Sequence, residues 1–432
     1  AGARAASPAS AAAVSSAFDS AGQRCSALRL LCVQEDVAPR LVQMLQGATQ
    51  ELRTGDPRAL ATDVGPVIDA AARAGLEAHV QAMAAAGRRV WRAPAPTRAR
   101  GHFVPPTLIE IERVSELRQE VFGPVLHVLR YPREELARVL ETIAATGYGL
   151  TQGVHTRIDE TVAQVVEASV AGNIYVNRNI VGAVVGVQPF GGQGLSGTGP
   201  KAGGPLYLLR LLRQAPPQAA RLAVARNAIA APPAGVPVGR LPQAGERQAL
   251  AALRTWAQAQ GLTELAARCD QAAAESPVGP WLMLQGPTGE ANLYAVRPRA
   301  QVLGLAAPGP AGDGDRLVQL AAILAVGAHA LWPAQAQALA DRLPPPLREH
   351  ITLAADWTQP GLPIDAVLLH GARAERLRTA QALAARPGPI VGLTALGPGD
   401  ARVPLERLVI ERSVAINTAA AGGNASLMTL AP

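Results

Sequence analysis

Residues 27–52, ALRLLCVQEDVAPRLVQMLQGATQEL, place a short apolar run directly before a helical pattern. The run ALRLLCV is typical of a buried strand, and an amphipathic period follows from Pro39 to Leu52. The same alternation extends outward, with a helix expected through Ser20 and further elements up to about residue 213. Helices are expected near 69–86, 133–145 and 161–168, and strands near 103–109, 126–131, 153–155 and 173–176. This order predicts an α/β fold with parallel strand pairing.

The length of 432 residues favours two or three domains. Residues 1–12 are expected to be an irregular lead-in, 13–213 a first α/β domain, and the Pro/Ala/Gly-rich passage 214–243 a linker. Residues 244–412 predict a second, Rossmann-like α/β domain. Its expected elements are a helix at 246–274, a hairpin of 281–285 and 292–297, a strand at 301–306, a helix at 315–326, and strands at 366–370, 390–393 and 405–410. In the tail 413–432, apolar residues alternate as in a strand, so it is expected to pack on the first domain.

Composition excludes several classes of function. No apolar run approaches eighteen residues and the first residues lack the order of a secretion signal, so a cytoplasmic protein without a transmembrane segment is predicted. Three cysteines and seven scattered histidines show no metal-ligand spacing, so no metal is expected. The net charge of +7 comes from dispersed arginines without interleaved aromatics, which argues against nucleic acid. Lys201, the single lysine, lies in a glycine-rich segment that suggests a surface turn, and it is left out of the predicted site.

Cys25 stands in the stretch DSAGQRCSAL, residues 19–28, where Gly22, Ser26 and Ala27 keep its surroundings open. A catalytic thiol needs room for its substrate and backbone donors for the oxyanion that it creates. Cys32, inside the apolar run, is expected to be plain core. On local grounds alone Cys25 is either a nucleophile or a small buried residue.

Two further segments carry chemical signals. Residues 188–205, QPFGGQGLSGTGPKAGGP, contain GxGxxG at Gly192, Gly194 and Gly197, but the prolines and glycines that follow prevent the helix that a dinucleotide fingerprint requires. A loop beside the active centre is the better interpretation. Residues 120–124, EVFGP, place Glu120 and Phe122 before a tight turn, either as a ribose-binding pair or as a solvated carboxylate and a core ring.

In this order, AGQRCS, EVFGP and NRN with PFGG resemble the catalytic half of the aldehyde dehydrogenase superfamily. DSAGQRCSALR, the segment 176–205 and SVAINTAAAGGNASLMTL resemble more narrowly the glutamate-semialdehyde dehydrogenase module and C-terminal domain of the proline utilization A family. The resemblance covers nearly all of the chain beyond about Val14. It implies an aldehyde dehydrogenase catalytic-domain fold, followed by a Rossmann-like domain that covers a substrate-channelling tunnel and by a tail that packs back on the catalytic domain.

The resemblance also implies NAD-dependent oxidation of L-glutamate γ-semialdehyde to L-glutamate in proline catabolism. Cys25 would be the nucleophile, passing through a thiohemiacetal and a thioester, and its backbone N–H would help to hold the oxyanion. The remaining implied roles are cofactor binding by Glu120 and Phe122, and substrate binding by Ser26, Gly182, Ala183 and Phe190. A homo-oligomer is implied for the full-length family.

The sequence departs from the family ahead of Cys25, where only 24 residues stand. The dinucleotide-binding half, its ETGG-type motif and the Asn of the oxyanion hole do not occur, so an N-terminally truncated chain is expected, one that needs the missing part for activity. The proline dehydrogenase barrel is also absent, so no FAD site is expected. The alternative is a catalytically inactive structural or interaction fragment. In the second domain, residues 308–315 do not form a phosphate-cradling turn, so no cofactor is expected there.

Overall fold

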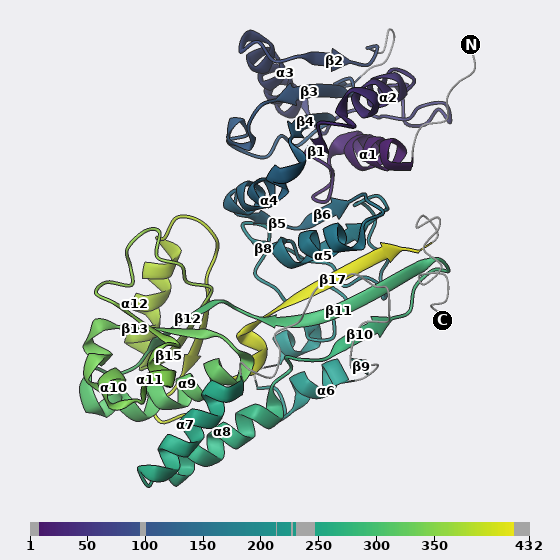
Figure 1. The fold of residues 1–432 in the computed structure, drawn as a ribbon. Helices are drawn as coiled ribbons and strands as arrows, with labels where there is room; N and C mark the ends of the chain where they lie inside the picture. Colours follow the sequence, from purple (N-terminus) through teal and green to yellow (C-terminus); the bar gives the residue numbers. More distant parts are fainter. Residues whose placement is uncertain (1–7, 96–100, 213, 226–227, 230–246, 419–432) are drawn as a thin grey trace.

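The computed structural model describes residues 8–95, 101–212, 214–225, 228–229 and 247–418 (Figure 1). These residues form three main sheets with helices packed against them. In Figure 1 the first sheet lies at the top, the second crosses the middle, and the third lies at the lower left. No helix in these ranges is long and apolar enough to cross a membrane.

The first sheet has the strand order β1-β4-β3-β2, with parallel pairing except between β2 and β3. The strands are β1 (Leu30–Gln34), β2 (Val90–Arg92), β3 (Thr107–Ile111) and β4 (Val125–Tyr131). The helices of this part are α1 (Pro8–Phe18), α2 (Ala38–Gln50) and α3 (Ala70–Ala85). The expected strand at 27–33 is thus confirmed with a shifted start, and the predicted helices 39–52 and 69–86 are confirmed.

Helix α1 corrects the predicted lead-in, because it begins at Pro8 instead of near Ala13. Proline is well tolerated in the first turn of a helix, and alanine has the highest helix propensity. Ala13, Ala17 and Phe18 are buried in the core of the first sheet, so tertiary packing adds to that propensity. Residues 1–7 of the predicted lead-in lie outside the described residues.

The second sheet joins strands from both halves of the sequence in the order β6-β7-β17-β11-β10-β9. From the first half come β6 (Thr151–Val154) and β7 (Asn173–Val176), beside α4 (Leu136–Ala145) and α5 (Asp159–Ala168). The others are β9 (Ala228–Ile229), β10 (Trp281–Leu284), β11 (Glu290–Pro298) and β17 (Val409–Asn417). β17 pairs parallel to β7 and antiparallel to β11.

This sheet crosses the domain boundaries predicted at residues 213 and 244, because its strands come from both predicted domains. The hairpin and the last strand complete the sheet of the first domain, because β7 would otherwise expose unpaired backbone groups at its edge. The predicted packing of the tail is observed for Ser413–Ile416, which pair with β7, whereas residues 419–432 lie outside the described residues. Within the predicted linker, helix α6 (Ala219–Ala225) and β9 are formed, and most of its remainder is not described.

The third sheet is wholly parallel, in the order β14-β13-β12-β15-β16, which is the Rossmann-like winding predicted from the sequence. Its strands are β12 (Gln301–Leu305), β13 (His329–Pro333), β14 (Ile351–Ala354), β15 (Ala366–His370) and β16 (Gly392–Leu396). Its helices are α9 (Asp313–Val326), α10 (Gln337–Arg342), α11 (Pro345–Arg348) and α12 (Arg373–Ala384).

Two predicted elements of this region differ in detail. The single helix expected at 246–274 is two helices, α7 (Arg247–Ala259) and α8 (Thr263–Glu275), because Gly261 between them takes a left-handed φ of 70°. The strand expected at 405–410 begins instead with the 3₁₀ helix η8 (Leu405–Arg407).

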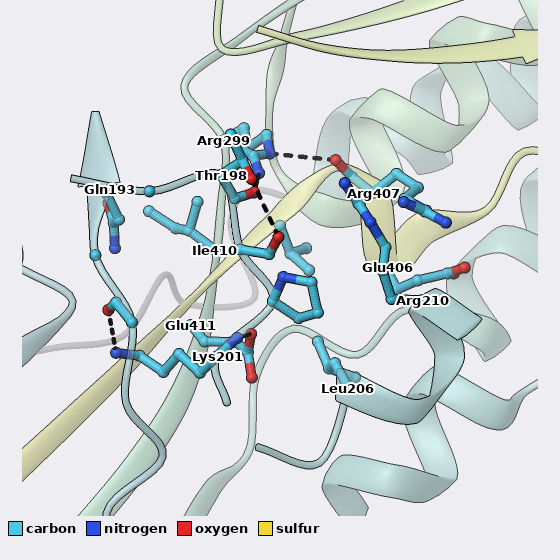
Figure 2. A pocket seen from close by; sticks show the side chains of 16 residues that line it. Gln193, Thr198, Lys201, Leu206, Arg210, Arg299, Glu406, Arg407, Ile410 and Glu411 are labelled. Atoms are coloured by element: carbon cyan, nitrogen blue, oxygen red, sulfur yellow. Dashed lines mark hydrogen bonds between the residues drawn. The ribbon is translucent and has the colours of Figure 1, made fainter. Parts of the chain in front are cut away.

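A small cavity lies where the glycine-rich loop meets the second sheet (Figure 2). Its walls come from residues 191–193 and 197–201 of that loop, from the 3₁₀ helix η4 (Tyr207–Leu211), and from η8 and the start of β17. The loop itself contains the two-residue strand β8 (Gln193–Gly194), which pairs with β5 (Tyr148–Gly149). The loop is therefore held between elements of both halves of the chain.

Candidate active site

Cys25 lies in a tight turn just after the 3₁₀ helix η1 (Asp19–Gly22), and it is exposed. The backbone N–H of Ala27 donates to the carbonyl of Arg24 at 3.1 Å and closes the turn around the thiol. Upstream, Gly22 has a φ of 63°, and a Cβ on it would lie 2.3 Å from the carbonyl oxygen of Gly123. Only glycine therefore allows the cysteine turn to lie directly against the loop that follows Glu120.

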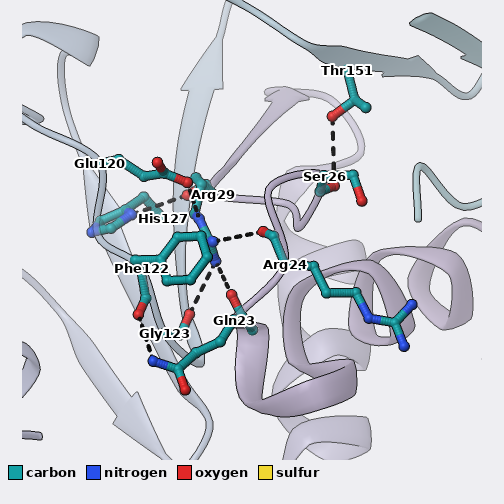
Figure 3. Close-up of polar contacts among 10 residues, drawn as sticks. Gln23, Arg24, Ser26, Arg29, Glu120, Phe122, Gly123, His127 and Thr151 are labelled. Atoms are coloured by element: carbon teal, nitrogen blue, oxygen red, sulfur yellow. Dashed lines mark hydrogen bonds and ion pairs between the residues drawn. The ribbon is translucent and has the colours of Figure 1, made fainter. Parts of the chain in front are cut away.

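Arg29 connects the cysteine turn to the Glu120 loop, as Figure 3 shows. Its guanidinium donates to the carbonyls of Gly22 at 2.5 Å, Arg24 at 3.0 Å and Gly123 at 3.2 Å. Its Nε lies 3.3 Å from the Glu120 carboxylate. One side chain thus holds three backbone carbonyls and one carboxylate.

The same guanidinium also lies over the ring of Phe122, 4.8 Å from the ring centroid. Burial lowers the pKa of Arg29, whereas the negative charge of Glu120 acts in the opposite direction. Sequence reasoning missed Arg29. The only signal in the sequence was a basic residue four positions after the cysteine.

Glu120 and Phe122 keep enough free surface to bind a ligand. The Glu120 side chain is 38% exposed and the Phe122 residue 41% exposed, although both contact Arg29. A carboxylate held on one side can still accept hydrogen bonds from a sugar diol, and an exposed ring can pack on a flat ligand. The residues present therefore fit the ribose and nicotinamide side of a dinucleotide.

A broad groove runs past the thiol between the first and second sheets. Cys25, Arg29 and Glu120 line it together, along with residues of β1, α2, α4 and β6. The other predicted site residues are not among its lining residues. They are Ser26, Phe122, Gly182, Ala183 and Phe190.

The predicted substrate loop is attached to the cysteine turn through Ser16 of α1. Its carbonyl accepts from the N–H of Leu28 at 2.9 Å, and its hydroxyl accepts from the N–H of Ile180 at 3.1 Å. Gly182, two residues further on, is exposed and has a φ of 78°. Ser26 is only 6% exposed, which leaves little of its hydroxyl for a ligand.

Strand β11 supports the same loop from the other side. Gln188 donates to Glu290 at 2.8 Å and to Asn292 at 3.0 Å, and it accepts from the N–H of Val184 at 3.0 Å. Arg178 forms a further ion pair with Glu290. The loop that carries Gly182 and Ala183 therefore depends on a hairpin more than a hundred residues downstream.

The sequence prediction that Lys201 lies in a surface turn is wrong, because Lys201 is only 2% exposed. Its Nζ donates to the side-chain oxygen of Asn173 at 2.6 Å and to the carbonyl of Gly191 at 2.7 Å. These buried oxygens satisfy the amine where water cannot. Among the described residues, no group of three or more His, Cys, Asp or Glu could hold a metal ion.

Residues 5–214 match the model of the aldehyde dehydrogenase family. The chain is 50% identical to the bifunctional protein PutA of Escherichia coli over 425 residues, 96% of this chain and 31% of the relative. It is 35% identical to the 1-pyrroline-5-carboxylate dehydrogenase of a Geobacillus species over 198 residues, 45% of this chain and 38% of the relative. The chain thus spans about a third of the length of these curated PutA relatives.

The structure of proline utilization A from Corynebacterium freiburgense superposes with a TM-score of 0.63 at 23% identity, over 95% of this chain and 37% of that chain. This match supports the fold. The family model and the identity to PutA confirm the resemblance inferred from the cysteine, glutamate and glycine-rich motifs. Residues 5–214 therefore form a domain of the aldehyde dehydrogenase family, and the chain as a whole is similar to a C-terminal portion of PutA.

Proposed function

We propose that this domain oxidises L-glutamate γ-semialdehyde to L-glutamate with NAD, as a step of proline catabolism. The observation that carries the proposal is that one side chain, Arg29, binds both the cysteine turn and the Glu120 loop. The exposed thiol of Cys25 and the carboxylate of Glu120 line one groove, and Arg29 connects that carboxylate to the backbone of the turn that carries Cys25. The names of the relatives, a bifunctional PutA and a 1-pyrroline-5-carboxylate dehydrogenase, support the substrate class.

In this mechanism the Cys25 thiol gives its proton to solvent and its Sγ bonds to the aldehyde carbon, while the carbonyl π bond opens and the oxygen takes on the negative charge. The backbone N–H of Cys25 donates to that oxygen. Glu120 and Phe122 would hold NAD, which when bound accepts two electrons and a hydrogen from the substrate carbon. Loss of that hydrogen restores the C=O bond and leaves the carbon joined to Sγ as a thioester. Water then adds to this carbon and the C–S bond breaks, which releases the carboxylate product and returns a proton to the thiol.

The α-carboxylate of the substrate would bind at the loop that contains Gly182 and Ala183, with Phe190 against the aliphatic part. Backbone N–H groups near a glycine of positive φ form a concave donor set that suits a carboxylate. Because Ser26 is buried, most of the anchoring falls to these backbone groups. This assignment makes the loop the part of the site that distinguishes an amino-acid aldehyde from a simple one.

The test is NADH formation from glutamate semialdehyde by the purified chain, alone and mixed with the dinucleotide-binding half of a PutA relative. We expect turnover in the mixture, its loss in Cys25→Ala, and its retention in Cys269→Ala, since Cys269 is buried between α8 and its neighbours. Absence of NADH in both preparations would overturn the proposal. It would favour the second candidate, a catalytically inactive structural or interaction fragment.

A further inference from the structure

The single lysine lies in a buried polar cluster where three strands and the glycine-rich loop meet. Figure 2 shows Glu411 at the backbone end of Lys201 and the side-chain amine extending away from it. The N–H of Lys201 donates to Glu411 at 2.6 Å, and the Tyr294 hydroxyl donates to the other carboxylate oxygen at 2.7 Å. Lys201, Glu411 and Tyr294 are 2%, 6% and 0% exposed. Strands β11 and β17 thus hold the loop through one carboxylate.

The other end of the cluster fixes the backbone on both sides of Phe190. Asn173 donates to the carbonyl of Pro189 at 2.9 Å and accepts from the N–H of Gly191 at 3.1 Å. Lys201 then donates to the same Asn173 oxygen and to the carbonyl of Gly191. Phe190 itself exchanges two backbone hydrogen bonds with Ala202, at 2.8 and 3.0 Å.

The amine is packed closely against Gly172 of the turn before β7. A Cβ on Gly172 would lie 2.1 Å from the carbonyl oxygen of Gly191 and 2.9 Å from the Nζ of Lys201. Ser413 of β17 adds a further hydrogen bond, 2.9 Å, to the Pro189 carbonyl. The loop therefore has one well-defined position against β7 and β17.

The electrostatics agree with this geometry. Burial lowers the pKa of Lys201 to about 7, with Glu411 opposing and Arg412 adding to the effect, and burial raises the pKa of Glu411. A neutral amine has two hydrogens, and two acceptors are in place for them. The other charged groups around the adjoining cavity are Arg210, Arg299, Glu406 and Arg407.

We propose that Lys201 is a positioning residue for the substrate loop: it fixes Phe190 against the second sheet so that the ring can flank the aliphatic part of the aldehyde. This inference rests on the proposed function. The lysine does not touch the reacting atoms, and it acts through Gly191 and Asn173. Because Glu411 and Ser413 belong to β17, the position of the loop also depends on the last strand of the described chain.

The first test does not require catalysis. Hydrogen exchange is followed by mass spectrometry on peptides that cover residues 189–202, in the wild type, Lys201→Met and Gln319→Leu. Gln319 is the matched control, since it is also buried and its side chain also contacts two partners, Leu305 and His370, but it lies in helix α9, away from the loop. We expect exchange of these peptides to be about tenfold faster in Lys201→Met and unchanged in Gln319→Leu.

Unchanged exchange in Lys201→Met, or an equal increase in Gln319→Leu, would overturn the proposal. If Lys201→Met does not fold, Lys201→Gln is used instead, since its amide also carries two donor hydrogens and is one atom shorter. Protection in Lys201→Gln should then exceed that of Lys201→Ala, and equal exchange in the two would overturn the proposal.

The second test separates positioning from general damage. In the mixture that forms NADH, Lys201→Met should raise the KM for glutamate semialdehyde about tenfold, with the KM for NAD and the alkylation rate of Cys25 unchanged. A fall in kcat with an unchanged KM for the aldehyde would overturn the positioning role. If the wild type forms no NADH, the proposed function fails, while the exchange experiment still decides whether Lys201 fixes the loop.

Discussion

Replacing Arg29 by methionine should loosen both halves of the candidate active site at once. The substitution keeps an unbranched apolar stem but removes the donors to Gly22, Arg24 and Gly123. Hydrogen bonds from a charged group contribute about 1.5–3 kcal/mol each, and leaving a buried acceptor unpaired costs about 1–3 kcal/mol. The pair with Glu120 adds little, because that carboxylate is 38% exposed.

These terms overlap, so we expect the free energy of unfolding of the first domain to fall by about 3 kcal/mol. For a domain of roughly 200 residues, that loss lowers Tm by about 6–12 °C. Scanning calorimetry measures the shift. The matched control is Arg58→Met, since the Arg58 side chain is 89% exposed and pairs with Asp56 only at the surface. A fully exposed pair contributes little to stability, so the control should melt like the wild type.

The expected fall in Tm can be tested directly by comparing the two variants. If Arg29→Met and Arg58→Met melt within about 2 °C of each other, the guanidinium of Arg29 does not hold the two loops, given the shift expected per kcal/mol. In the NADH assay the same variant should raise the KM for NAD, because Glu120 and Phe122 lose the group that orients them.

Iodoacetamide at pH 8 should label Cys25 at least about 10³-fold faster than Cys32 and Cys269. Burial raises the pKa of Cys32 and Cys269 to about 12, which leaves roughly 10⁻⁴ of each as the reactive thiolate at pH 8. Similar labelling of all three cysteines would contradict this prediction. Deleting residues 413–432 should lower Tm and increase dye binding, because it removes the pairing partner of β7, and an unchanged melting curve would show that the tail stabilises nothing. Folding lowers the pKa of Lys201 from its ordinary value of 10.5 to about 7. Between pH 7 and 10.5 the unfolded chain therefore binds one proton at Lys201 that the folded chain does not. The free energy of unfolding of the wild type should rise with pH in this range relative to that of Lys201→Met. Denaturant titrations at pH 7, 8 and 9 measure the difference, and a flat difference would rule out this titration.

The sequence predicts those parts of the fold that local patterns specify. Strands such as 173–176 and helices such as 69–86 are confirmed within a few residues, because side-chain periodicity and flanking residues determine them. The pairing of β17 between β7 and β11 is not visible in such patterns. Any apolar strand of similar length satisfies them equally, and the partner lies about 240 residues away.

Some residues of the candidate site could be identified from local sequence patterns, and others could not. Cys25 and Glu120 could be found from short motifs, since each motif combines a reactive side chain with glycines that the backbone requires. Arg29 and Lys201 could not, because their roles come from carbonyl oxygens contributed by distant loops. A rare residue type was the only signal for Lys201, and its glycine-rich surroundings favoured an exposed turn.

The interleaved strand order also affects the synthesis of the protein. Asn173 pairs with Ser413, so β7 leaves the ribosome long before β17 exists. At about 5–20 residues per second, roughly 240 further residues take about 10–50 seconds to be made. During that interval the nascent chain carries an unpaired strand edge and an unsupported glycine-rich loop, both of which invite contacts with other chains. The glycine-rich loop therefore reaches its final position late, and chaperone demand should be greatest while the parallel third sheet is still emerging.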